Sequence, residues 1–97
     1  MAPENSEDQA TETGLSIYPN PLSDNAVFEI TLDKQSLVSL IVYNVLGDQV
    51  QSVEKQVMQS GTTNIEFKAG DLKPGIYFCQ MIIDNDKTII KRMEVIR

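Results

Sequence analysis

Apolar and polar residues alternate along several stretches of this chain, and turn-forming residues separate these stretches. Between Ala26 and Leu32, the side chains of Phe28, Ile30 and Leu32 share one side, while those of Val27, Glu29 and Thr31 fall on the other. A period of two residues is typical of a β-strand with one buried face. The same reasoning predicts strands that begin near residues 15, 26, 37, 49, 62, 75 and 87, and it predicts no helix.

Residues 75–83 form the most apolar of these stretches. The stretch follows Pro74-Gly75, a pair that forces a turn because proline fixes φ and glycine tolerates positive φ. Its apolar side chains occupy both faces, with Tyr77, Cys79, Met81 and Ile83 on one and Ile76, Phe78 and Ile82 on the other. A strand that is apolar on both faces is usually central and covered on both sides. We therefore expect other elements to pack over each face.

Short strands at this spacing, with turn signals between them, are typical of an antiparallel sandwich. The predicted fold is all-β, an immunoglobulin-like antiparallel β-sandwich of about seven strands. Residues 49–57 are weakly patterned and are expected at an edge of a sheet. The predicted core includes Phe28, Ile30, Leu40, Val42, Ile65, Phe67, Tyr77, Cys79 and Met81.

In the last predicted strand, residues 87–96, the apolar residues do not keep one phase. Ile90 cannot share one side of a regular strand with Met93 and Val95. A β-bulge at Lys91-Arg92 would restore the phase, and both cations would then point outward. We expect this bulge on an edge strand.

Charge divides the chain into two parts. Residues 1–14 contain four acidic and no basic residues, and we predict that they are a disordered acidic linker. They hold −4 of the total net charge of −6, so the predicted immunoglobulin-like domain, residues 15–97, is nearly balanced. This balance argues against a nucleic-acid partner. No run of about 18 apolar residues exists, so no membrane-spanning segment is expected.

We expect no secretory signal at the start of this sequence, because Met1 leads into polar residues. This start fits a complete cytosolic protein, and it fits equally well a segment taken from the end of a longer one.

The sequence lacks the residues that most catalytic sites need. It has no histidine, its one cysteine is Cys79, and its carboxylates occur singly in turns or alternate outward on strands. The Asp84-Asn85-Asp86 turn could bind calcium weakly, but it lacks the further oxygen ligands and the glycine of a dedicated calcium loop. We expect no enzyme activity, no cofactor and no dedicated metal site.

Four segments carry a resemblance to a known family: Tyr18-Pro19-Asn20-Pro21, Val42 to Val50, Leu72 to Phe78, and Lys91 to Val95. In this order, over about residues 15–97, the chain resembles the C-terminal sorting domain of the type IX (Por) secretion system of Bacteroidetes. The motif and turn residues are Pro19, Asn20, Pro21, Asn44, Gly47 and Pro74. Asn44 stands where the family often has Asp, and Arg92 stands where a second Lys is common; both replacements keep the turn or the charge.

The resemblance implies a non-catalytic secretion signal. It implies an N-terminal cargo protein, passage through the periplasm to the outer membrane, cell surface or extracellular space, and removal of the domain afterwards. The implied partners are the outer-membrane translocon and a sortase-like cysteine protease. Sorting recognition is expected at Gly75, Tyr77, Lys91, Arg92 and Val95.

Two alternatives stay open, an adhesive or carbohydrate-binding immunoglobulin-like module and a stalk domain of a surface protein. The binding module needs an exposed aromatic platform. The chain has no Trp, and its three Tyr and three Phe are expected mostly in core-facing positions. A sorting domain must end its parent protein, whereas the other two can stand anywhere in it.

Overall fold

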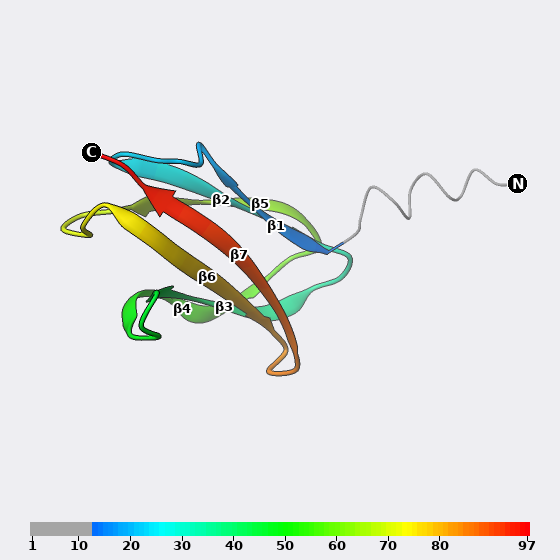
Figure 1. Ribbon diagram of the computed structural model, residues 1–97. Helices are drawn as coiled ribbons and strands as arrows, with labels where there is room; N and C mark the ends of the chain where they lie inside the picture. Colours follow the sequence, from blue (N-terminus) through cyan, green and yellow to red (C-terminus); the bar gives the residue numbers. More distant parts are fainter. Residues whose placement is uncertain (1–12) are drawn as a thin grey trace, which may run out of the picture.

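The computed structural model describes residues 13–97, which form two stacked β-sheets (Figure 1). The described residues contain seven strands and no helix. The strands are β1 (Gly14–Tyr18), β2 (Asn25–Leu32), β3 (Ser36–Asn44), β4 (Gln49–Met58), β5 (Gly61–Lys68), β6 (Gly75–Ile83) and β7 (Lys87–Val95). The predicted all-β antiparallel sandwich is confirmed, and each strand begins within one residue of its predicted position.

Non-sequential strand pairs give the sandwich its topology. One sheet has the order β1-β2-β5 and the other the order β4-β3-β6-β7, and all strand pairs are antiparallel. Because β2 pairs with β5 and β3 with β6, the chain crosses repeatedly from one sheet to the other, as in immunoglobulin-like Greek-key folds. β4 and β7 are the edge strands of the larger sheet, as the sequence predicts.

The folded part includes the last two residues of the predicted linker. The Thr13 hydroxyl donates to a carboxylate oxygen of Asp33 (3.1 Å) and accepts from the Asp33 N–H (3.2 Å). Gly14 pairs with Thr31 as the first residue of β1. The prediction of disorder for residues 1–12 lies outside the described residues.

The core lies between the two sheets. Of the nine predicted core residues, eight are buried, and Ile65 is half-buried against the others. The rings of Phe28 and Phe67 stack at the centre, with centroids 4.8 Å apart. The core also contains residues that the strand patterns alone do not identify, among them Leu22, Ala69, Met93 and Val95.

The outer face of β6 is not covered by another layer in residues 13–97, so this expectation is wrong. Ile76 and Ile82 are half-buried and Phe78 is 36% exposed. β6 is central because β3 and β7 flank its two edges, but only its inner face meets the second sheet. The expected burial of most aromatic residues is also wrong, because Tyr18 and Phe78 are exposed and Tyr43 lies opposite Phe78 on this outer face.

The predicted bulge in β7 is absent. The pairing of β7 with β6 is continuous from Gly75↔Val95 to Ile83↔Lys87. Ile89, and not Ile90, therefore faces inward in phase with Met93 and Val95, while Ile90 is 59% exposed. The prediction that both cations point outward is wrong as well, since neighbouring residues of a regular strand face opposite sides. Irregular register occurs instead between β3 and β4.

This register predicts a large difference between two substitutions in β7. Met93→Ala removes a fully buried side chain and is expected to lower the free energy of unfolding by about 2–5 kcal/mol. Ile90→Ala removes an exposed side chain and is expected to cost about 1 kcal/mol or less. Urea unfolding of both variants measures the difference, and equal costs would support the bulged register instead.

Burial makes Cys79 unreactive. Its side chain is fully buried, and desolvation raises the pKa of its thiol from 9.0 to about 12. Because the thiolate is the reactive form, native protein at pH 8 is expected to resist iodoacetamide. In denaturant, the same thiol should be alkylated at the rate of a model peptide. Rapid labelling of the native protein, followed by mass spectrometry, would show that β6 opens locally.

Candidate functional site: the motif end of the sandwich

The four motif segments of the sequence lie at one end of the sandwich. Asn44, which ends β3, pairs with Tyr77 near the start of β6, and Gly75 pairs with Val95 at the end of β7. The segment after β1 contacts the end of β7 through Asn20. In Figure 1 this end lies on the left, with the C-terminus, and β1 begins at the opposite end. We call it the motif end; it consists of residues 18–22, 44–48, 72–77 and 91–95.

Asn20 pairs with the backbone of β7 through its side chain. Its Nδ2 donates to the C=O of Arg92 (2.9 Å), and its Oδ1 accepts from the N–H of Glu94 (3.1 Å). A side-chain amide has one donor side and one acceptor side, as a peptide group does. The Asn20 side chain thus supplies hydrogen-bond partners for backbone groups on the outer edge of β7, where the flanking prolines, Pro19 and Pro21, have no backbone N–H to donate. Both prolines follow cis peptide bonds.

Leu22 continues this pairing with its backbone. Its N–H donates to the C=O of Glu94 (2.9 Å), and its C=O accepts from the N–H of Ile96 (2.8 Å). The Leu22 side chain is buried between the sheets. Residues 19–22, which we call the capping segment, therefore cover the second half of the outer edge of β7.

Asn44 and Gly47 shape the hairpin between β3 and β4. The Asn44 Oδ1 accepts from the N–H groups of Leu46 (3.0 Å) and Asp48 (2.9 Å). Gly47 has φ of +90° and donates its N–H to the Asn44 C=O (3.0 Å). A side chain at this positive φ is strained, which confirms the predicted turn role of glycine here. The turn leaves Val45 and Leu46 67% and 82% exposed.

Tyr77 holds the turn that precedes β6. Its ring is buried, and its hydroxyl donates to the Lys73 C=O (2.6 Å), which anchors the residue before Pro74. Gly75 follows with φ of +154°, and no heavy atom lies within 4 Å of the position that a Cβ would take. Backbone conformation, and not space, is thus what favours glycine at this position.

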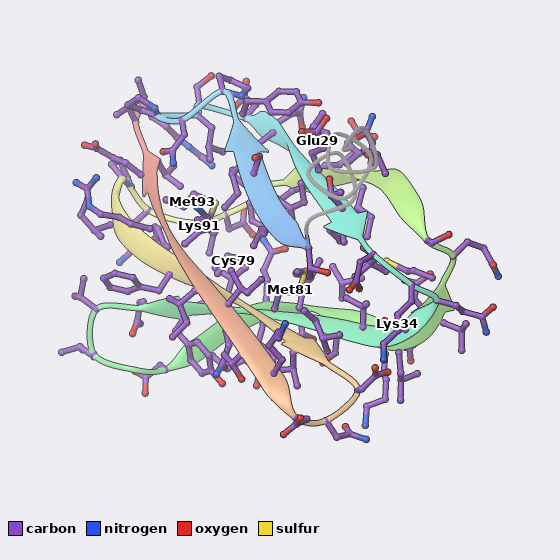
Figure 2. All side chains as sticks on the ribbon, turned by 90° about the vertical axis from the view of Figure 1, so that its right-hand side faces the viewer. Glu29, Lys34, Cys79, Met81, Lys91 and Met93 are labelled. Atoms are coloured by element: carbon purple, nitrogen blue, oxygen red, sulfur yellow. The ribbon has the colours of Figure 1, made fainter. Side chains whose placement is uncertain are left out.

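The structure divides the five predicted recognition residues into two groups. Gly75, Lys91 and Arg92 are exposed, whereas Tyr77 and Val95 are buried. Arg92 lies on the outer face, opposite Phe78 and 4.0 Å from a carboxylate oxygen of Glu94. Lys91 lies opposite Cys79 and points to the inner side of β7 (Figure 2). The two cations therefore do not form one patch.

Side chains of the Asp84-Asn85-Asp86 turn form hydrogen bonds with residues of β3 and β4. Asp84 Oδ1 accepts from the Leu37 N–H (2.8 Å), and Asn85 Oδ1 accepts from Lys55 Nζ (3.1 Å). Within residues 13–97, no three His, Cys, Asp or Glu side chains are grouped closely enough to bind a metal ion. The same residues contain no helix that is long and apolar enough to cross a membrane.

Sequence reasoning did not identify the contact between Asn20 and β7. The residues involved are 72 and 74 positions apart. One signal was available: an asparagine between two prolines cannot extend a strand, so its side chain is free to pair with another element.

Replacement of Asn20 should destabilise the domain and expose the edge of β7. Asn20→Ala removes two hydrogen bonds and is expected to cost about 1–3 kcal/mol in the free energy of unfolding. Asn20→Asp keeps the acceptor for the Glu94 N–H but loses the donor to the Arg92 C=O, so a smaller cost is expected. Urea unfolding gives the costs, and amide exchange at Glu94 should accelerate in the alanine variant. Unchanged exchange there would contradict the assigned contact.

Comparisons with known proteins give a family and a fold. A family model described as "Secretion system C-terminal sorting domain" matches residues 16–96. No curated protein matches the chain. Among solved structures, dimeric latent PorU from Porphyromonas gingivalis superposes with a TM-score of 0.71 at 19% sequence identity. That match covers 84% of this chain and 9% of PorU, so the chain is similar to a small part of that protein in fold. A β-glucosidase from Listeria innocua, in complex with glucose, gives a TM-score of 0.46 at 14% identity, over 87% of this chain and 16% of the enzyme.

Proposed function

The chain belongs to the family of secretion system C-terminal sorting domains of the type IX system, and we propose from this premise that it directs an attached cargo protein across the outer membrane. The cargo precedes the domain in the parent protein and reaches the cell surface or the extracellular space by way of the periplasm. A sortase-like cysteine protease then removes the domain. The domain itself acts without catalysis, and its partners are the outer-membrane translocon and this protease.

The observation that carries the proposal is the meeting of the four motif segments at the motif end. Residues 18–21 and 91–95 are far apart in the sequence, and the contacts of Asn20 with Arg92 and Glu94 bring them together. A partner that binds this end therefore recognises a folded surface and not a linear peptide. This requirement fits a signal that must be recognised after the domain has folded.

In this proposal, the buried and the exposed residues of the motif end have different roles. Tyr77 and Val95 are inaccessible to a partner, and they act by fixing the positions of the Pro74-Gly75 turn and the end of β7. Gly75, Lys91 and Arg92 are accessible and are the residues that the secretion machinery contacts. Arg92 is the most direct candidate, because 62% of its side chain is exposed at the motif end.

A secretion assay tests this assignment. The chain is fused to the C-terminus of a reporter that is exported to the periplasm of a type IX-competent cell. The wild-type fusion should reach the surface or the medium and lose the domain, as the size of the reporter on a gel shows. Lys91→Glu/Arg92→Glu should reduce the exported reporter by about tenfold, equivalent to about 1.4 kcal/mol of partner binding, and leave the rest in the periplasm.

The matched control is Lys34→Glu/Lys68→Glu, which makes the same change of charge at two exposed cations outside β7. Substitutions of exposed residues usually change stability by no more than about 0.5 kcal/mol, so both double variants should unfold at nearly the wild-type temperature. Normal secretion of a folded Lys91→Glu/Arg92→Glu variant would exclude these cations from recognition. Retention of the wild-type fusion in the periplasm would overturn the sorting function itself.

A further inference from the structure

Half of the outer edge of β7 has no partner among the residues that the structure describes. The groups that the capping segment binds are the C=O of Arg92, the N–H and C=O of Glu94 and the N–H of Ile96. Backbone groups alternate in direction along an antiparallel strand, so the even-numbered residues of β7 point away from β6. The N–H and C=O groups of Thr88 and Ile90 and the N–H of Arg92 therefore lie on this outer edge.

These groups have no hydrogen-bond partner within residues 13–97. β7 pairs with β6 alone on its other side, and β1 pairs with β2. Figure 1 shows that β1 and β7 approach each other toward the motif end and separate toward the opposite end. The capping segment closes the first region, and the unpaired groups of Thr88, Ile90 and Arg92 begin beside it and extend toward the opposite end. We call residues 88–92 the open edge.

The side chains of the open edge differ between its two faces. Ile90 is 59% exposed on the outer face of the sheet. Lys91 points to the inner side, between β7 and β1 (Figure 2), where Ile89, Leu15 and Ser16 line a shallow hollow of about 390 Å³ with it. No carboxylate of residues 13–97 lies within 4.0 Å of Lys91 Nζ. The open edge thus presents an apolar side chain and a cation on opposite faces.

We propose that the open edge binds an extended segment of a partner protein, in which apolar and acidic residues alternate, by β-strand addition. The backbone of that segment would pair with the free groups of Thr88, Ile90 and Arg92. Side chains of an added strand alternate between the two faces of the sheet, as those of β7 do. An apolar residue beside Ile90 therefore places its neighbour beside Lys91, where a carboxylate is favoured.

Lys91 also limits the partners that can bind. A charge that points inward from an edge strand opposes the addition of an apolar strand, because the cation would be enclosed without a counter-charge. An acidic segment supplies that counter-charge. A purely protective edge predicts that neither acidic nor basic strands bind, so the two roles of Lys91 are distinguishable.

The test uses the full chain and two synthetic peptides of eight residues, one of alternating valine and glutamate and one of alternating valine and lysine. Titrations are followed by the amide chemical shifts of the isotope-labelled chain. The glutamate peptide should bind about fivefold more tightly than the lysine peptide, the scale of an exposed pair of charges that changes from attraction to repulsion. Amide exchange should slow at Thr88, Ile90 and Arg92 when the glutamate peptide is bound.

Lys91→Glu should invert this preference. The matched control is Arg92→Glu, which makes the same charge change one residue away but on the opposite face. It should weaken binding of the glutamate peptide by less than twofold. Equal effects of the two substitutions would show non-specific attraction by charge and would overturn the proposal. Shift changes confined to residues away from β7 and from the hollow beside Lys91, or no binding of either peptide, would overturn it as well.

The peptide test is independent of the proposed sorting function, because it measures binding by the isolated chain in solution. A chain that sorts its cargo normally but binds neither peptide would retain the proposed function and lose this inference. A chain that binds the glutamate peptide but does not sort its cargo would support strand addition at β7, with a partner outside the secretion machinery.

Discussion

The outer edge of β7 is bound by a segment that is not a strand, and the arrangement of the motif end depends on this contact. A β-sandwich leaves unpaired backbone groups along the edges of both sheets, and unpaired groups invite association with other chains. Asn20 and Leu22 satisfy three such groups of β7 and the N–H of Ile96 just after it, while their own segment continues from β1 in the other sheet. The same four contacts therefore close an edge and hold the two sheets together.

The register of β7 links this contact to the core. Since Arg92 and Glu94 direct their backbone groups toward the capping segment, Met93 and Val95 between and beside them direct their side chains inward, where both are buried. Leu22 enters the same core from the capping segment. The motif residues are thus mostly structural. Gly75, Lys91 and Arg92 are exposed members of the same segments.

The turns explain why so much of the fold could be predicted from the sequence. Gly47 and Pro74-Gly75 determine their local conformation by themselves, so the strands between such turns could be placed to within a residue. The face assignment within β7 could not be made in this way, because Ile89 and Ile90 are both apolar and only pairing with β6 decides which one is buried.

The candidate site was less predictable, for two physical reasons. Asn20 contacts a strand more than seventy residues later in the chain, and no local pattern reports such a pairing. Burial of Tyr77 could be predicted from the apolar face that it shares with Cys79 and Met81, but its hydroxyl contact with Lys73 depends on the path of the turn. Apolar residues on the outer face of β6 also led to a wrong prediction, because a strand that is apolar on both faces does not show whether a second layer covers it.

The position of β7 in the order of synthesis has a consequence for quality control. Met93 and Val95 come from the last strand of the domain, and both fill the space between the sheets. A ribosome that stops before β7 releases a product whose interior stays open to water and whose Asn20 has no strand to bind. Only a product that includes β7 can present the assembled motif end. A sorting signal built in this way is absent from every copy of the protein that is truncated before β7.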